Sequence, residues 1–300
     1  MQVKDVWRNR NFILLLALTL GFLWAEGAEW TVHMVIPALA LVMLVSTIEV
    51  PDTIFRSPRK LLTPTMVGIA INYAVLGVLI LILNNLVIHD DPTWTGFVIL
   101  AAVPPAVKTI AFTYSLGGDT TFSLFGTIGC YLVALIMTPL MILAFLGSIL
   151  LDPGKPFIIM IEVIIIPLCV SRVLLWTKTA ERMKPVRGVI TNWSFFVIVY
   201  TSVALNRGVF LSSPLSLLPI AVIATVCTFL LGSLIGGLAA FLRIDSKTRT
   251  SLILLGTLKN DSIAVGLALS LFDQRTAVPA TVFVVFMIVY LIWLGFNTRH

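Results

Sequence analysis

Long apolar stretches, separated by short polar connections, dominate the chain. About 20 predominantly apolar residues are needed to cross the hydrocarbon core of a bilayer, and ten stretches approach or exceed that length. They lie near residues 12–26, 31–49, 64–88, 95–116, 120–150, 156–176, 187–206, 215–242, 248–271 and 276–297. The pattern predicts an all-α polytopic membrane protein with ten transmembrane helices, numbered 1 to 10 here, and little chain for a soluble domain.

The composition agrees with this pattern. Of the 300 residues, 59% are hydrophobic and only 11% are charged, and the mean hydropathy is +1.05. A soluble domain has about 25% charged residues. The lipid bilayer is therefore the expected solvent for most of the chain.

The basic residues of the connections predict the orientation. With the N-terminus inside, 15 of the 20 lysines and arginines fall on the cytoplasmic side, 3 fall outside and 2 lie within the spans. The positive-inside rule then predicts a multi-pass protein of the cell (inner) membrane with both termini cytoplasmic. The 15 are Lys4, Arg8, Arg10, Arg56, Arg59, Lys60, Arg172, Lys178, Arg182, Lys184, Arg187, Arg243, Lys247, Arg249 and Arg299, and the 3 are Lys155, Arg207 and Arg275.

Several function classes are disfavoured. The formal net charge of +6 follows from the cytoplasmic loops, so it does not indicate nucleic-acid binding. The three histidines, His33, His89 and His300, lie near predicted helix ends without ligand spacing, and no Gly-x-Ser-x-Gly or His-Glu-x-x-His pattern occurs. We expect no enzyme activity, no cofactor and no metal ligands.

The most informative residues are two lysines inside apolar spans, Lys108 and Lys259. A lysine at the centre of a lipid-facing helix costs roughly 2.5–3.5 kcal/mol, so both should face a polar interior or a partner. Each lies beside helix-weakening residues: Pro104 and Pro105 precede Lys108, and Gly256 precedes Lys259. The pairing of charge and interruption points to a transport site.

The two interruptions occupy corresponding places in the chain. If ten helices divide into residues 1–150 and 151–300, helices 4 and 9 are equivalent, and an odd number of spans per half gives the two halves opposite orientations. Lys108 and Lys259 are 151 residues apart. Interrupted helices in corresponding positions of inverted repeats are a strong sequence indication of a transporter binding site.

Residues around both interruptions resemble the bile acid:sodium symporter family. The runs 104–114 and 118–123 and the pair Thr138-Pro139 resemble that family's helices 4 and 5, and 259–264 resembles its Gln-Asn-x-x-Leu-Ala motif. The resemblance covers the whole ten-span layout. It implies a panel domain (helices 1, 2, 6 and 7) against a core domain (helices 3–5 and 8–10), in which interrupted helices 4 and 9 cross.

The sodium ligands that the resemblance implies are only partly retained. Ser123 and Thr127 match two hydroxyl ligands of the first site, and Thr109 stands where a serine is expected. A shift of one residue in helix 4 would instead place Lys108 there. Ile110 replaces a neighbouring asparagine, and Leu255 replaces the glutamate that both sites share.

At the second site, Asn72 stands where the family has a glutamine, and Lys259 replaces a ligating glutamine. Sodium, as a hard cation, needs several oxygen ligands, whereas a protonated lysine offers no lone pair and repels it. We therefore expect Lys259, together with Lys108, to replace sodium as fixed positive charge, and we expect no sodium binding.

The leading hypothesis is a secondary transporter of small organic anions that works by alternating access without sodium, with proton coupling as an option. An alternative is a cation/proton antiporter in which Asp261 carries the proton beside Lys259, and a receptor that does not transport is a third possibility. The residues expected at the substrate or coupling site are Lys108, Thr109, Thr113, Ser123, Thr127, Lys259, Asn260, Asp261 and Asn72.

Overall fold

The computed structural model describes residues 7, 9–48, 58–212 and 214–297. Of the basic residues that predict the orientation, Lys4, Arg8, Arg56 and Arg299 lie outside these ranges. The described residues are helical, and their one β-type pairing is an isolated bridge between Pro105 and Lys259. The all-α prediction is confirmed.

The first half begins with α2 and ends with the long helix α9. Its elements, in chain order, are α2 (Arg10–Leu23), α3 (Ala28–Thr31), η1 (Val32–Met34), α4 (Val35–Ile48), α5 (Pro58–Ile69), η3 (Ala70–Gly77), α6 (Val78–Val87), α7 (Asp91–Ala102), α8 (Thr109–Ser115), α9 (Thr120–Leu146) and η4 (Gly147–Ile149). Element η3 is a π-helical segment that joins α5 to α6 in one continuous span.

The second half has a similar succession of elements. They are α10 (Lys155–Met160), η5 (Ile161–Ile165), α11 (Ile166–Trp176), α12 (Thr179–Met183), η6 (Lys184–Val186), α13 (Arg187–Leu205), α14 (Arg207–Ser212), η7 (Pro214–Leu217), α15 (Leu218–Thr225), η8 (Val226–Leu230), α16 (Leu231–Phe241), α17 (Ser246–Thr257), α18 (Asp261–Leu271), η9 (Arg275–Ala277) and α19 (Val278–Asn297). Elements η5 and η8 are again π-helical segments within continuous spans.

Seven helical segments of the described chain are long and apolar enough to cross a membrane, so the protein is a multi-pass membrane protein. The other three predicted spans are shorter or divided. Residues 12–26 correspond to the 14-residue α2, 95–116 to α7 and α8, and 248–271 to α17 and α18. Both interruptions expected from the lysines and their neighbours are therefore present, whereas the count of ten spans stays a prediction.

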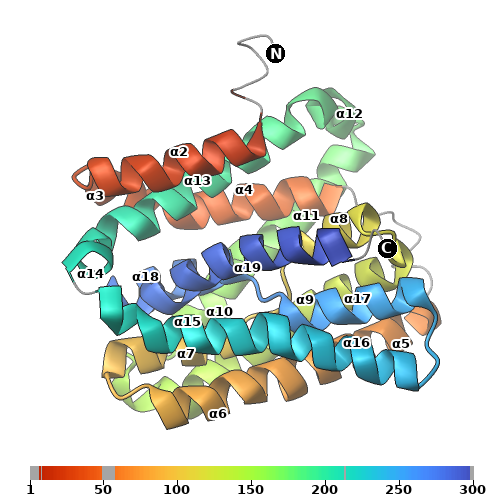
Figure 1. The fold of residues 1–300 in the computed structure, drawn as a ribbon. Helices are drawn as coiled ribbons and strands as arrows, with labels where there is room; N and C mark the ends of the chain where they lie inside the picture. Colours follow the sequence, from red (N-terminus) through yellow and green to blue (C-terminus); the bar gives the residue numbers. More distant parts are fainter. Residues whose placement is uncertain (1–6, 8, 49–57, 213, 298–300) are drawn as a thin grey trace.

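The helices form two groups (Figure 1). In the upper part of the view α13 lies beside α2 and α4, and α11 packs on α4. Below them α9 packs on α5 and α7, and α17 packs on α16. Helix α18 lies between the groups because it contacts α4 and α13 as well as α7 and α19. This arrangement brings the second interruption to the boundary between the groups.

Candidate functional site

The two interrupted segments cross and are hydrogen-bonded to each other. The Ala106 amide donates to the Leu258 carbonyl oxygen at 3.2 Å, and the Asn260 amide donates to the Pro104 oxygen at 2.9 Å. Helix α7 ends before Pro104 because a residue that precedes proline is forced out of the helical region. Val103 is accordingly extended, with φ −74° and ψ 155°.

The carbonyl oxygens of residues 101–104, at and after the end of α7, accept hydrogen bonds from distant side chains or from the backbone of the second interruption. The Lys259 ammonium donates to the Ala101 oxygen at 2.7 Å and to the Val103 oxygen at 2.9 Å. The Thr138 hydroxyl donates to the Ala102 oxygen at 2.7 Å. Buried carbonyl groups must find partners, and Lys259 supplies two of the bonds that proline and the helix end would otherwise leave unmade.

The surroundings of Lys259 suit a cation. Its side chain is 2% exposed, and its ammonium lies 4.6 Å from the centre of the Tyr73 ring. The C-terminal end of a helix carries partial negative charge, and an aromatic face attracts a cation. The ammonium thus occupies a cation-binding position formed by carbonyl oxygens and a π-face, and it is covalently attached to the chain.

Asn72 binds the carbonyl groups at the end of α17, as Lys259 binds those at the end of α7. Its side-chain amide donates to the Leu255 oxygen at 2.9 Å and to the Leu258 oxygen at 3.4 Å. Asn72 is presented by the π-helical segment η3, and π-segments in long helices often occur at functional sites. At each interruption, the carbonyl groups at the helix end therefore accept hydrogen bonds from a polar side chain that is distant in sequence.

Asn260 and Asp261 begin α18. The Asn260 side chain accepts from the Ile263 amide at 3.1 Å and donates to the Tyr131 hydroxyl. Asp261 follows in the first turn, where the helix dipole favours negative charge. It is 2% exposed, and its Oδ2 has no hydrogen-bond partner among the described residues.

The four hydroxyl residues expected at the site lie together on α8 and α9. Thr113 donates to the Thr109 carbonyl at 2.8 Å and shares a 2.7 Å hydrogen bond with Ser123. All four are buried, and in the described chain the hydroxyls of Thr109 and Thr127 have no partner. The buried Leu255 of α17 lies against Gly126 of α9. Helix α17 therefore presents a hydrocarbon side chain to α9.

Lys108 lies in different surroundings, at the N-terminal end of α8. Its ammonium is 5.8 Å from the centre of the Phe195 ring on α13. Both residues line a cleft of about 530 Å³ between α4, α8, α9 and α13, together with Arg187, Thr191 and Asn192. The rest of the wall combines apolar and hydroxyl side chains: Val42, Val45, Ser46, Val107, Ile110, Ala111, Tyr114, Thr120, Gly188 and Leu124.

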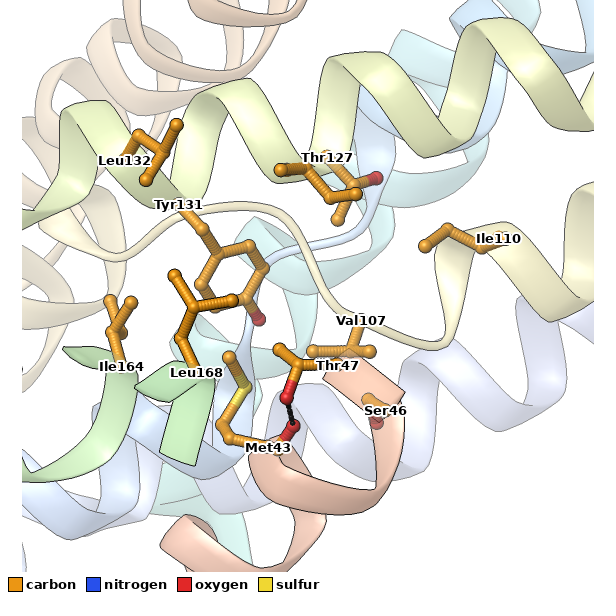
Figure 2. A pocket seen from close by; sticks show the side chains of 11 residues that line it. Met43, Ser46, Thr47, Val107, Ile110, Thr127, Tyr131, Leu132, Ile164 and Leu168 are labelled. Atoms are coloured by element: carbon orange, nitrogen blue, oxygen red, sulfur yellow. Dashed lines mark hydrogen bonds between the residues drawn. The ribbon is translucent and has the colours of Figure 1, made fainter. Parts of the chain in front are cut away.

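Two small cavities lie next to this cleft. One, of about 40 Å³, is almost wholly apolar; Figure 2 shows Thr127 and Tyr131 of α9 on one side of it and Met43, Ser46 and Thr47 of α4 on the other. The other has about 20 Å³ and is lined by Lys108, Phe195, Asn260 and Ser262, among others. This second cavity extends from the Lys108 side chain to the start of α18.

A second large opening lies at the other end of α13 and α18. It has about 700 Å³ and is lined by Glu29, Val32, Leu205, Leu269, Phe272, Asp273, Gln274 and Arg275. Arg187 of the cleft and Leu205 of this opening are the first and last residues of α13. The 18 residue steps between them span about 27 Å at 1.5 Å per residue, close to the thickness of the hydrocarbon core.

The structure thus brings all nine expected residues to the crossing or beside it, but with unequal access. Lys108 lines the cleft and Asn260 the adjoining small cavity, whereas Lys259 is buried against the end of α7. Sequence reasoning missed Tyr131, Tyr73 and Phe195. Tyr131 could have been found, because it follows Ser123 and Thr127 at steps of four on one face of a helix.

Comparison with known proteins gives a consistent picture. Residues 12–295 match the model of the SBF-like CPA transporter family. A protein of Bacillus subtilis (strain 168), described as "Uncharacterized sodium-dependent transporter YocS", is 23% identical over 191 residues. That match covers 63% of this chain and 59% of the relative, so the chain matches less than two thirds of that protein's length. The family match spans nearly the whole chain, which confirms a transporter and not an enzyme, and the protein belongs to the SBF-like CPA transporter family.

Proposed function

We propose that the protein is a sodium-independent secondary transporter of small organic anions that works by alternating access. The proposal includes ten membrane spans in two inverted five-helix repeats, residues 1–150 and 151–300. It also includes a panel group (α2, α4, α11 and α13) that moves against a core group containing the crossing. Both termini are cytoplasmic and the membrane is the inner membrane, in keeping with the 15 cytoplasmic and 3 external basic residues.

The observation that carries sodium independence is the position of the Lys259 ammonium. It donates to two carbonyl oxygens at the end of α7, at 2.7 and 2.9 Å. A sodium ion at this end of the helix would use those same oxygens and would be repelled by the ammonium. At the hydroxyl cluster of α8 and α9, the buried Leu255 supplies no carboxylate to balance a cation.

The name of the Bacillus relative attributes sodium dependence to that protein. We do not extend it to this chain because Lys259 and Leu255 remove an ion position and a negative ligand from the crossing. This chain is a transporter by its family and the relative is a transporter by its name, and the coupling ion is where this proposal separates them.

The cleft supports an anionic substrate with an apolar body. Lys108 and Arg187 place positive charge in it, while Val42, Val45 and Phe195 line it with hydrocarbon. Its volume of about 530 Å³ lies within the range of small-molecule sites, roughly 300–1,000 Å³. Arg187 and Phe195 are eight residues apart on α13, about 12 Å along the helix. Because the Lys108 ammonium lies beside the Phe195 ring, we place Lys108 at the deep end of the cleft and Arg187 at its mouth.

Alternating access is supported by openings at both ends of α13. The 530 Å³ cleft contains Arg187, on the side we assign to the cytoplasm, and the 700 Å³ opening contains Leu205 and Arg275, on the opposite side. The crossing lies between them, beside the middle of α13. A shift of α4 and α13 relative to the crossing would close one opening and widen the other around a central site.

Uptake of radiolabelled organic anions into proteoliposomes tests the proposal. We expect saturable uptake of a carboxylate or sulfonate that does not change when external sodium is replaced by choline. Uptake that rises steeply and saturably with sodium but not with choline would contradict sodium independence. Labelling of a single cysteine at the exposed position 179 tests the orientation, since an external position 179 would reverse it.

The buried Asp261, whose Oδ2 has no partner in the described chain, supports a second candidate function, exchange of a cation for a proton. In that case Asp261 would alternate between a proton and a monovalent cation beside Lys259. Proteoliposomes with an internal pH dye separate the candidates. A potassium or sodium gradient that drives proton movement without any organic anion would favour exchange.

A further inference from the structure

Two buried hydroxyl groups form a hydrogen bond between the panel group and the core group. Ser202 of α13 is 1% exposed, Thr281 of α19 is 4% exposed, and their side-chain oxygens are hydrogen-bonded to each other. Helix α13 packs on α2 and α4, whereas α19 packs on α7, α15 and α18. By contrast, Thr225 and Thr228 each donate to the carbonyl four residues earlier in their own span. The Ser202–Thr281 contact therefore joins two groups that alternating access must move relative to each other.

The direction of this hydrogen bond follows from the other bond that Thr281 makes. The Thr281 hydroxyl donates to the Ala277 carbonyl oxygen at 2.9 Å. A hydroxyl group has a single hydrogen to donate, so Ser202 is the donor to Thr281. When the two helices separate, the Ser202 hydroxyl can rotate and donate to the Ile198 carbonyl oxygen, one turn earlier in α13. The contact can therefore open and form again without leaving a buried donor unsatisfied.

The core-facing residues of α13 place this contact between the crossing and the external opening. Phe195, Ile198, Ser202 and Leu205 follow one another at steps of three or four residues, so they share one face of the helix. Phe195 lines the small cavity beside the crossing, and Leu205 lines the opening of about 700 Å³. Ser202 lies about 10 Å beyond Phe195 and about 4.5 Å short of Leu205 at 1.5 Å per residue. A substrate that leaves the crossing for the external side must pass Ser202.

The path is closed at this level. Ile198 is buried in the same apolar cluster as Val278 and Val282 of α19, which lie on either side of Thr281 in the sequence. On the other side of the crossing, the cleft of about 530 Å³ reaches Lys108. The structure is thus open toward the side that we assign to the cytoplasm and closed toward the external side.

Each partner of the contact is fixed within its own group. Next to Ser202 in the sequence, Thr201 shares a 2.6 Å hydrogen bond with Thr31 of α3, which ties this part of α13 to the panel group. On the core side, Gly96 of α7 lies against the carbonyl oxygen of Thr276, in η9 immediately before α19. A movement of one group against the other must therefore break the contact, because neither side of it can give way within its own group.

We propose that the Ser202–Thr281 hydrogen bond is an external gate, which is closed while the cytoplasmic cleft is open and breaks once in each transport cycle. This inference rests on the proposed alternating access and adds the contact that must open before the external side can reach the crossing. Because the contact consists of two neutral hydroxyl groups, it is weak enough to open reversibly. A covalent bond in its place should leave anion binding in the cleft intact and should stop transport.

The first test replaces the hydrogen bond by a disulfide. In a protein in which Cys130, Cys169 and Cys227 are replaced by serine, Ser202→Cys is combined with Thr281→Cys and oxidised with copper phenanthroline. Side chains in hydrogen-bond contact have Cβ atoms close enough for a disulfide. We expect oxidation to abolish uptake of 1-naphthalenesulfonate into proteoliposomes, and dithiothreitol to restore it. Binding of the same anion, measured by thermal-shift titration, should be unchanged by oxidation.

The neighbouring Thr31–Thr201 pair provides a matched control, because it is also a hydroxyl pair at this level of α13 but lies wholly within the panel group. The Thr31→Cys/Thr201→Cys protein, oxidised in the same way, should keep its uptake. Mass spectrometry of proteolytic peptides verifies each disulfide, and uptake by the reduced proteins shows that they fold. Uptake that survives the disulfide between positions 202 and 281, or that is lost equally with the control disulfide, would overturn the external gate.

The second test needs no substrate. Ile198→Cys places a thiol one turn below the contact, at a position that is buried in this structure. Its reaction with a membrane-impermeant maleimide added from the external side should be slow, and adding Ser202→Ala should speed it. Thr201→Ala, which removes one hydroxyl of the control pair, should leave the rate unchanged. An equal rate with and without Ser202→Ala would refute the gate even if the double-cysteine proteins fail to fold.

The two tests separate this inference from the proposed anion transport. Faster labelling of Ile198→Cys in the presence of Ser202→Ala supports the external gate whatever the substrate is. If 1-naphthalenesulfonate and a set of carboxylates are then neither bound nor transported by the wild type, the assignment to organic anions is contradicted and the gate is retained.

Discussion

The two lysines of the apolar spans each lie beside a helix interruption but have different surroundings. Lys259 is 2% exposed and donates to the Ala101 and Val103 carbonyl oxygens. Lys108 lies over the Phe195 ring and lines the cleft between α4, α8, α9 and α13. The same residue type therefore satisfies buried backbone carbonyl groups at one interruption and lines a cleft at the other.

Lys259→Met should cause the largest loss of stability. It removes the ammonium that donates to the Ala101 and Val103 carbonyl oxygens and leaves both buried acceptors unsatisfied, at a cost of about 1–3 kcal/mol for each. The thermal unfolding midpoint of the detergent-solubilised protein measures the effect. Lys108→Met is the matched control and should change the midpoint little. Equal destabilisation by the two variants would remove the distinction drawn here.

Asn72→Leu should cause the next largest loss. The substitution keeps approximate volume but removes the donor to the Leu255 and Leu258 carbonyls at the end of α17. Leaving a buried acceptor unmade costs about 1–3 kcal/mol, and the same thermal measurement applies. Asn84→Leu offers a comparison away from the crossing, because Asn84 donates to the Trp94 carbonyl at 3.0 Å. A larger loss of thermal stability in Asn84→Leu than in Asn72→Leu would show that the crossing does not depend on the Asn72 side chain more than another buried site depends on its amide.

Lys108→Met should lower the affinity for an organic anion at least tenfold, about 1.4 kcal/mol, with little effect on unfolding. The reason is that it removes positive charge from the deep end of the cleft, where the Lys108 side chain is only half-buried. Isothermal titration or thermal-shift titration with 1-naphthalenesulfonate provides the measurement. Arg187→Met, at the mouth of the cleft, should lose less. Unchanged affinity in both variants would contradict the assignment of this cleft to the anion.

Lys259→Gln should weaken anion binding because it removes positive charge from the crossing. It should not by itself create sodium dependence, because Leu255 still supplies no carboxylate. Combining it with Leu255→Glu should restore stabilisation by sodium over choline. At 100 times its dissociation constant, sodium would add about 2.7 kcal/mol. Stabilisation of the wild type by sodium but not by choline would contradict this prediction.

The smallest effect is expected at an exposed helix cap. Hydrogen bonds from the Thr248 amide, and also from the Thr248 side chain and the Lys247 amide, hold the pKa of Asp245 below its usual value at the start of α17. A lowered pKa contributes stability at neutral pH that is lost as the pH falls through the lowered value. Asp245→Ala should therefore lower the unfolding midpoint slightly at pH 7 and not in strong acid. A difference that persists in acid would indicate a role for Asp245 other than capping by its charge.

Much of the site could be predicted because its chemistry is local. Pro104 and Pro105 end α7, and the side chain of Asn260 caps the start of α18. Both helix boundaries can be predicted from residue type and position. The equivalence of the two interruptions in an inverted repeat stays a prediction from their spacing. The separation of Lys108 from Lys259 was not predictable in this way, because both are lysines in apolar stretches at matching places in the two halves.

The sequence by itself determined that the chain crosses a membrane repeatedly and that two spans are broken beside a lysine, since apolar length and proline or glycine act within a few residues. Tertiary structure alone decided which groups satisfy the broken backbone. Lys259 reaches carbonyls 158 and 156 residues earlier in the chain, and Asn72 reaches carbonyls 183 and 186 residues later. Such contacts depend on how distant helices pack, and packing also leaves Lys108 facing the cleft while burying Lys259 against the end of α7.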